Sequence, residues 1–274
     1  MITLAAERIT SSGRRGSSRP VVVDTSAGAR LVKLRGAAQG TGPLVGEIVV
    51  AELAEALGLS VPARSLITLS AEIETANWDD ELADLLAASV GLNLGFDFLP
   101  GAREMTPGEG ERIAPLDRAS ILWLDRLVLN PDRTSANPNL LWWANGLWLI
   151  DHGAALGFQY AWGRVTEGSP REPALMPDAH LFESVVPEDE LRTADATLAP
   201  RLTRDVLQAA VAAVPDAFLQ PLLQGTRGVT LTRRRAAYVA FLWKRLKAPR
   251  PFLEGRPLPA ERRSVPPEWL GKRR

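Results

Sequence analysis

The stretch that decides the fold runs from residue 130 to residue 153 and reads NPDRTSANPNLLWWANGLWLIDHG. Two apolar runs of strand length, Leu140 to Trp143 and Leu147 to Ile150, lie on either side of Asn145-Gly146. The Asn-Gly pair predicts a β-hairpin, because both central residues of a type I′ turn need a positive φ angle. The hairpin would return the chain, at Asp151, to the start of its first strand.

The predicted hairpin brings three oxygen-bearing side chains together, those of Asp132, Asn137 and Asp151. Such a set suits magnesium-dependent phosphoryl transfer, in which one carboxylate orients the attacking hydroxyl while an amide and a second carboxylate hold the metal. Asn139 competes with Asn137 for the metal, because it directly precedes the first strand of the hairpin. The spacing from Asp132 favours Asn137, which is the residue we predict.

The region upstream supplies a lysine and a glutamate in suitable elements. Strands are predicted at Val21–Val23 and Ala29–Leu34, and Lys33 is a lone charge in the second of them. By itself, a lysine on a half-exposed strand is usually a surface residue. A helix is predicted from Leu44 to Leu57, because its apolar residues recur at helical spacing, and it carries Glu47 near its start.

In this order, Lys33, Glu47, Asp132, Asn137 and Asp151 resemble the parts of a HipA-like kinase over roughly residues 28 to 155. The Asp-Arg-Thr-Ser-Ala-Asn loop is similar to the Asp-Arg-His-x-x-Asn loop of HipA-like and phosphoinositide 3/4-kinase-like enzymes. Asp-His-Gly stands where kinases carry Asp-Phe-Gly. The helix that begins with Glu-Ile-Val-Val-Ala-Glu also looks like its HipA-like counterpart. The sequence departs from these patterns at Thr134, which replaces the loop histidine, and at His152, which replaces phenylalanine.

The resemblance implies an α+β fold of the bilobal protein-kinase type, with a β-rich N-lobe at residues 1–100 and a helical C-lobe at residues 101–274. It also implies ATP and Mg²⁺ as cofactors. Lys33, braced by Glu47, would hold the nucleotide phosphates, and Asp132 would act on the acceptor hydroxyl. Asn137 and Asp151 would hold the metal, and adenine would bind backbone groups near Phe98 and Leu99, just before a Pro100-Gly101 hinge.

The acceptor implied by the resemblance is a protein serine or threonine. A small-molecule or lipid acceptor stays open, as does a regulatory partner protein. A catalytically weak nucleotide-binding module is a further alternative, suggested by Thr134 and by the imperfect glycine pattern of Thr10 to Arg19, where a nucleotide-covering loop would lie.

Composition sets the outer limits of these expectations. The 274 residues are 46% hydrophobic and 23% charged, with no cysteine and two histidines. Thiolate metal sites and disulfides are therefore excluded, and a histidine-based zinc site is disfavoured. No apolar run approaches the ~20 residues that cross a bilayer, so we expect a soluble, cytoplasmic protein.

Charge is unevenly distributed along the chain. Residues 225–274 carry fourteen Lys and Arg against three Asp and Glu, although the formal net charge is zero. A solvated basic helix and tail is the favoured interpretation, and nucleic acid is the less favoured partner.

The remaining periodicity fills in the two lobes. It predicts strands at Leu66–Leu69 and Val90–Leu99 and helices at Trp78–Ala88, Asp117–Leu129, 199–223 and 231–246, with an irregular segment at 157–180.

Overall fold

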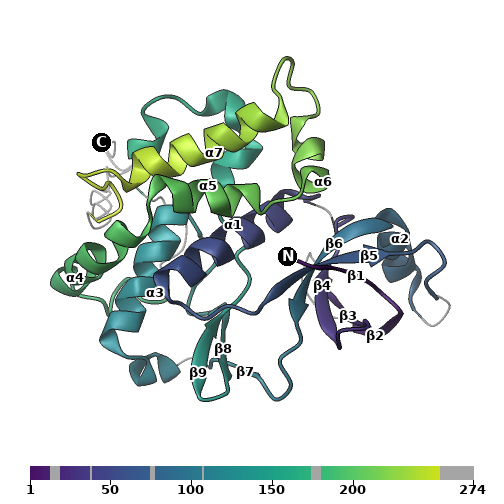
Figure 1. Cartoon of the computed structure of the whole chain (residues 1–274). Coiled ribbons are helices and arrows are strands. Elements are labelled where there is room, and N and C mark those ends of the chain that lie inside the picture. Colours follow the sequence, from purple (N-terminus) through teal and green to yellow (C-terminus); the bar gives the residue numbers. More distant parts are fainter. Residues whose placement is uncertain (13–18, 38, 75–77, 107, 174–179, 254–274) are drawn as a thin grey trace, which may run out of the picture.

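The computed structural model describes residues 1–12, 19–37, 39–74, 78–106, 108–173 and 180–253, and a sheet and a group of helices lie side by side in it (Figure 1). The strands of the larger sheet are β1 (Thr3–Ala5), β2 (Arg8–Ser12), β3 (Val21–Asp24), β4 (Arg30–Lys33), β5 (Arg64–Leu69) and β6 (Gly91–Asp97). Their order is β1-β5-β6-β4-β3-β2, and only the β1–β5 pair is parallel.

One face of this sheet packs against α2 (Asp80–Ala88). Val21 and Val23 are fully buried and alternate with the half-buried Val22, as side chains on the two faces of a strand do. Leu82 and Leu86 of α2 complete this small core. The strands predicted at residues 21–23, 29–34, 66–69 and 90–99 correspond to β3, β4, β5 and β6, and the helix predicted at 78–88 corresponds to α2.

Helix α1 (Gly42–Leu57) crosses between the sheet and the other helices (Figure 1). Twelve of its sixteen residues are buried, and the nine hydrophobic ones among them belong to the same core as the helices that follow in the chain. The helix ends at Gly58, whose φ of 84° is the left-handed conformation that glycine adopts without steric cost. Although α1 precedes residue 100, it shares its core with the helical part. The division of the chain at that residue stays a prediction.

The helical part is built around α3 (Pro115–Val128), in which every residue from Ala119 to Val128 is buried. Two helices pack against it, α4 (Glu188–Leu198) and α7 (Leu231–Leu246), whereas α5 (Arg204–Ala212) and α6 (Asp216–Leu219) pack against α1. Short 3-10 turns are η1 (Glu109–Arg112), η2 (Gly157–Tyr160), η3 (Trp162–Arg164), η4 (Ser169–Arg171), η5 (Ala199–Arg201) and η6 (Gln220–Leu223). Periodicity did not predict α4, whose first turn is acidic and whose buried residues are few.

A second, three-stranded sheet has the order β7-β8-β9 and contains β7 (Arg103–Glu104), β8 (Leu140–Trp143) and β9 (Gly146–Leu149). The predicted hairpin is present, but its turn lies one residue earlier than predicted. Trp143 pairs with Gly146, so the central residues are Ala144 and Asn145, with φ angles of 48° and 61°. In this register the buried Leu140 and Leu149 pair directly across the two strands, so both lie on the face of the hairpin that packs into the core.

The segment after β9 contains η2, η3 and η4, and charged side chains hold it against the helices. Arg245 of α7 is fully buried and donates to the Leu127 and Glu172 carbonyl oxygens at 3.0 and 2.7 Å. Burial lowers the pKa of this arginine to about 10. Lys244 pairs with Glu167 at 2.9 Å. The expectation of a fully solvated basic helix is therefore wrong at Arg245, whereas Lys244 and Glu167 form a pair at the surface.

Three expectations from the sequence remain predictions. Residues 13–18 of the predicted nucleotide-covering loop and residues 254–274 of the basic tail lie outside the described residues. Among the residues that are described, no single helix is long and apolar enough to cross a membrane. One bent pair of helical segments would be long and apolar enough by length and composition alone, Arg204–Ala212 with Asp216–Leu223. A cytoplasmic location is the third such prediction.

Candidate active site

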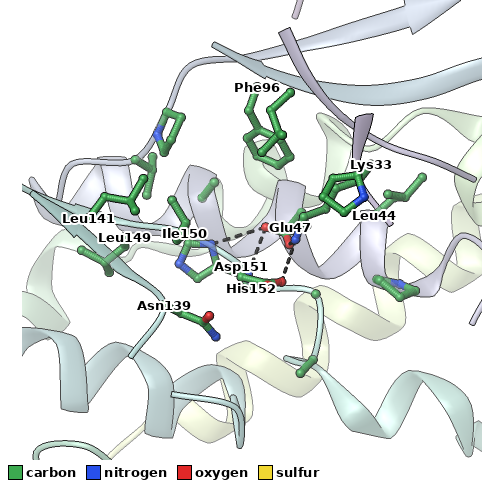
Figure 2. Close-up of a pocket in the computed structure, with 18 of the residues that line it drawn as sticks. Lys33, Leu44, Glu47, Phe96, Asn139, Leu141, Leu149, Ile150, Asp151 and His152 are labelled. Atoms are coloured by element: carbon green, nitrogen blue, oxygen red, sulfur yellow. Dashed lines mark hydrogen bonds and ion pairs between the residues drawn. The ribbon is translucent and has the colours of Figure 1, made fainter. Parts of the chain in front are cut away.

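A cavity of about 860 Å³ opens between the six-stranded sheet and the β8–β9 hairpin. Its walls come from β4, α1, β6 and the turn after β6, and its floor comes from the loop before β8 and the turn after β9. Figure 2 shows Lys33, Glu47 and Asp151 drawn together in it, with Asn139 nearby. This volume lies in the range usual for small-ligand sites.

Lys33, the last residue of β4, projects into this cavity (Figure 2). Its side chain is only 11% exposed, so the surface role that a lone strand lysine usually has is excluded. The ammonium pairs with Glu47 and donates to Asp151 Oδ1 at 2.6 Å. Burial alone would lower the pKa of Lys33, but the charges of Glu47 and Asp151 outweigh it and raise that pKa above its usual value. Lys33 is therefore a fixed positive charge.

Glu47 connects Lys33 to the turn after β9. Its carboxylate is fully buried, and Oε2 accepts a hydrogen bond from the backbone N–H of His152 at 3.0 Å. Burial alone would raise the pKa of Glu47, but Lys33 and His152 outweigh it and hold that pKa well below its usual range. One carboxylate thus fixes β4 and the Asp151-His152-Gly153 turn relative to α1.

The close approach of this turn to α1 depends on Gly46. A Cβ atom built at Gly46 would lie 3.0 Å from the His152 carbonyl oxygen and 3.3 Å from that of Gly153. The absence of a side chain lets the backbone of the turn reach the helix at the position next to Glu47. Sequence reasoning singled out Glu47 but not this neighbour.

Asp132 also lines the cavity, from the loop before β8. Its Oδ2 atom accepts hydrogen bonds from both candidate asparagines, Asn137 Nδ2 at 3.0 Å and Asn139 Nδ2 at 3.2 Å. Asn139 is buried, whereas Asn137 is exposed. Thr134, which replaces the loop histidine, is engaged in a local turn, where its Oγ1 accepts from Asn137 N at 3.2 Å.

The Asp132 loop rests on Asp125, a buried carboxylate of α3. Asp125 Oδ2 accepts from Arg133 Nε at 2.6 Å, and Oδ1 accepts from Asn130 Nδ2 at 2.8 Å. Arg133, itself fully buried, also donates to the carbonyl oxygens of Pro138 and Asn139 at 3.1 and 2.5 Å. Both ends of the loop are therefore tied to one helix residue.

His180 also contacts the Asp125 carboxylate. Its Nε2 lies 2.9 Å from Asp125 Oδ2, and its Nδ1 accepts from Phe182 N at 3.1 Å, which places the ring proton on Nε2. Burial alone would raise the pKa of Asp125, but Arg133 and His180 outweigh it and hold that pKa well below its usual range.

Sequence reasoning missed Asp125, Arg133 and His180. One feature of the sequence could have indicated this group: Asp125 is the only acidic residue in the largely apolar stretch of α3 that is buried. Such a residue needs partners, because an unpaired charge is not stable in a protein core. The identity of those partners depends on the fold, since Arg133 and His180 lie 8 and 55 residues away.

The other residues predicted to contact the nucleotide lie in the turn that joins β6 to β7. Phe98 and Leu99 both line the cavity, and Phe98 is 45% exposed. Gly101 has a φ of 76°, and Trp143 Nε1 of β8 donates to the Pro100 carbonyl oxygen at 3.0 Å. The turn is thus held against the second sheet.

The donor set of the cavity fits a hard divalent cation. Among the described residues, no three or more His, Cys, Asp and Glu side chains form a metal cluster. The Asp151 carboxylate and the nearby asparagine amides nevertheless offer oxygen ligands. Mg²⁺ commonly binds through one or two protein groups together with substrate phosphates and water, so this sparse set is compatible with it.

Comparisons with known proteins agree with this geometry. A family model described as HipA-like kinase matches residues 6–165. Among solved structures, the chain is similar to CtkA, a proinflammatory kinase of Helicobacter pylori, with 13% identity and a TM-score of 0.52. The alignment covers 90% of this chain and 98% of that one. No curated protein matches the sequence. The likeness to CtkA confirms the predicted α+β kinase-like fold.

Proposed function

Because the chain belongs to the HipA-like kinase family, we propose that it uses ATP and Mg²⁺ to phosphorylate a hydroxyl group, and that the acceptor is a protein serine or threonine. One observation carries this proposal. A buried lysine shared by Glu47 and Asp151 lines the same cavity as Asp132. This is the arrangement of charges that phosphoryl transfer needs.

Lys33 and Glu47 form the part of the site that receives the nucleotide. Lys33 would bind the phosphates as a compact point charge, and Glu47 would keep the ammonium in place. In the structure the ammonium also contacts Asp151. Mg²⁺, when bound, supplies charge neutralisation at the phosphates, and the Asp151 carboxylate with an asparagine amide would hold it. Adenine would lie against the backbone of Phe98 and Leu99.

Asp132 forms the part that receives the acceptor. Asn137 and Asn139 hold its Oδ2 atom, and within the described residues Oδ1 accepts no hydrogen bond. Oδ1 would therefore accept the hydrogen bond of the attacking hydroxyl and orient it towards the phosphate. Most of the acceleration would come from positioning and electrostatics, because phosphoryl transfer asks little covalent chemistry of the protein.

The cavity geometry supports the proposed reaction, whereas the proposed class of acceptor follows only from the family. The choice of a protein serine or threonine follows the family resemblance, as does a more distant relation to phosphoinositide 3/4-kinase-like enzymes. Small-molecule hydroxyl acceptors are the alternative within the same chemistry.

Transfer of labelled phosphate from Mg-ATP to a panel of proteins, the chain itself included, tests the proposal. The wild type should transfer phosphate, and Asp132→Asn should lose about 10²–10⁴-fold in rate while it still binds Mg-ATP in calorimetry. Asp84→Asn, an exposed carboxylate on α2 that does not line the cavity, is the matched control and should change the rate less than about twofold. A wild type that binds nucleotide but transfers nothing would instead support the nucleotide-binding module.

A further inference from the structure

We infer that His152 is a positioning residue, whose ring carries its proton on Nδ1 and directs it at Glu47, so that Glu47 stays turned towards Lys33. The inference rests on the proposed function, because it concerns the carboxylate that would keep the phosphate-binding lysine in place. The kinase pattern has phenylalanine at this position, and a phenylalanine ring has no nitrogen that could take this role.

The two carboxylate oxygens of Glu47 have different partners. Oε1 pairs with the Lys33 ammonium, and Oε2 accepts from the backbone N–H of His152 at 3.0 Å. The ring atom Nδ1 of the same histidine lies 3.6 Å from Oε2, and Figure 2 shows the ring turned towards Glu47. This distance is longer than an ordinary hydrogen bond, so the ring adds an electrostatic contact beside the backbone bond.

The histidine is enclosed and its backbone is fixed. His152 is only 2% exposed, and Glu47 is fully buried. The His152 carbonyl oxygen accepts from Ala155 N at 3.0 Å, and the missing side chain of Gly46 lets the turn lie directly against α1. An electrostatic contact between buried groups is screened less than one at the surface, so a separation of 3.6 Å still matters here.

The surroundings decide which ring nitrogen carries the proton. Glu47 is ionised, because Lys33 and His152 outweigh its burial and hold its pKa well below the usual range. A neutral imidazole has one N–H group and one lone pair, and a lone pair on Nδ1 would be repelled by this carboxylate. The buried Nε2 atom has no hydrogen-bond partner among the described residues, so a proton there would lack an acceptor. A proton on Nδ1 avoids both penalties.

The ring contact limits the rotation of the Glu47 carboxylate. A carboxylate that is held at one oxygen by a single N–H group can still turn about its last bond. A second N–H group directed at the same oxygen opposes that rotation, and Oε1 then stays directed at Lys33. His152 would thus act on the nucleotide only through Glu47 and Lys33.

Three substitutions separate this role from simple packing. His152→Asn places an amide nitrogen where Nδ1 lies, His152→Gln places one near Nε2 instead, and His152→Phe keeps a ring without nitrogen. In transfer assays at varied ATP, we expect kcat/KM to fall about tenfold in His152→Phe and His152→Gln, and His152→Asn to stay within about threefold of wild type. Urea denaturation checks that each variant is folded under the assay conditions.

A packing role predicts the opposite order, because phenylalanine resembles histidine in size and shape, whereas asparagine would leave a cavity. His152→Phe with a kcat/KM equal to that of wild type, or higher than that of His152→Asn, therefore overturns the inference.

A second measurement is independent of activity. The chain contains only two histidines, so nitrogen NMR of protein with isotope-labelled histidine reports on two rings, and His152→Phe identifies the signals of His152. We expect a proton on Nδ1 of His152. His180 is the internal reference and should carry its proton on Nε2, which lies against Asp125. A His152 ring with no proton on Nδ1 overturns the inference.

The two measurements also separate the inference from the proposed function. A wild type that transfers no phosphate, but whose His152 ring is protonated at Nδ1, contradicts the proposed function and supports the contact with Glu47. A wild type that transfers phosphate at the same rate as His152→Phe contradicts the inference alone.

Discussion

Two fully buried carboxylates, Glu47 and Asp125, have similar surroundings but serve different parts of the molecule. Each pairs with one cationic side chain and one histidine. Glu47 pairs with Lys33 and His152, and Asp125 pairs with Arg133 and His180. In both, burial is outweighed by the neighbouring charges, and the pKa of the carboxyl is held below its usual range.

The two sites differ in the other contacts that the cationic side chain makes. Lys33 lines the cavity and is shared with Asp151, whose side chain is 44% exposed. Arg133 does not reach the cavity, and it donates to backbone carbonyls of the Asp132 loop instead. The same pairing therefore presents a charge to a ligand in one place and shapes a loop in the other. A lysine suits the first task, and the forked guanidinium of arginine suits the second.

Asp125→Asn should give the largest change in stability. The substitution leaves Arg133 buried without a carboxylate, so we expect the free energy of unfolding to fall by about 3–5 kcal/mol. Urea denaturation followed by circular dichroism measures it. Glu188→Gln provides the matched control, since Glu188 and its partner Arg192 are 66% and 63% exposed, and such a pair contributes at most about 1 kcal/mol. Equal effects in the two variants would show that the Asp125 group is not a structural anchor.

Glu47→Gln should change stability less and activity more. Lys33 keeps Asp151 as a partner, and the glutamine can still accept from His152 N, so we expect a loss of about 1–3 kcal/mol. The misplaced ammonium should nevertheless lower phosphate transfer by about 100-fold in the folded enzyme. Denaturation and transfer assays at a temperature where the variant is folded separate the two effects. Unchanged transfer would remove Glu47 from the proposed mechanism.

The pH dependence of stability should show the smallest effect. A carboxyl whose pKa is lower in the folded state contributes stability that is complete above its unfolded pKa, about 4, and that is lost as the pH falls towards the folded value. Between pH 7 and pH 3 the wild type should therefore lose about 1 kcal/mol more stability than Asp125→Asn does. Denaturation at several pH values measures the difference, and parallel curves would contradict the assigned pairing.

The sequence was most informative where a local pattern has one physical outcome. The valine run at the start of β3, the helical spacing of α1 and the apolar runs on either side of Asn145 each predicted an element that the structure contains. The turn was displaced by one residue, since the observed register pairs the buried Leu140 with Leu149, a contact between strands that the Asn-Gly pattern does not encode. The acidic α4 was missed, since Leu191, Ala194 and Leu198 recur at helical spacing but are the only buried apolar residues of this helix.

By itself, the sequence determined which residues could carry the chemistry, because the order and spacing of Lys33, Glu47, Asp132 and Asp151 match a known pattern. Only the tertiary structure decided what each side chain contacts. In the fold, Lys33 is buried between the carboxylates of Glu47 and Asp151. Arg133 and His180 both bind the carboxylate of Asp125. Asn139 is buried, whereas Asn137 is exposed. Such contacts join residues far apart in the chain, and burial sets their strength, so spacing along the sequence cannot specify them.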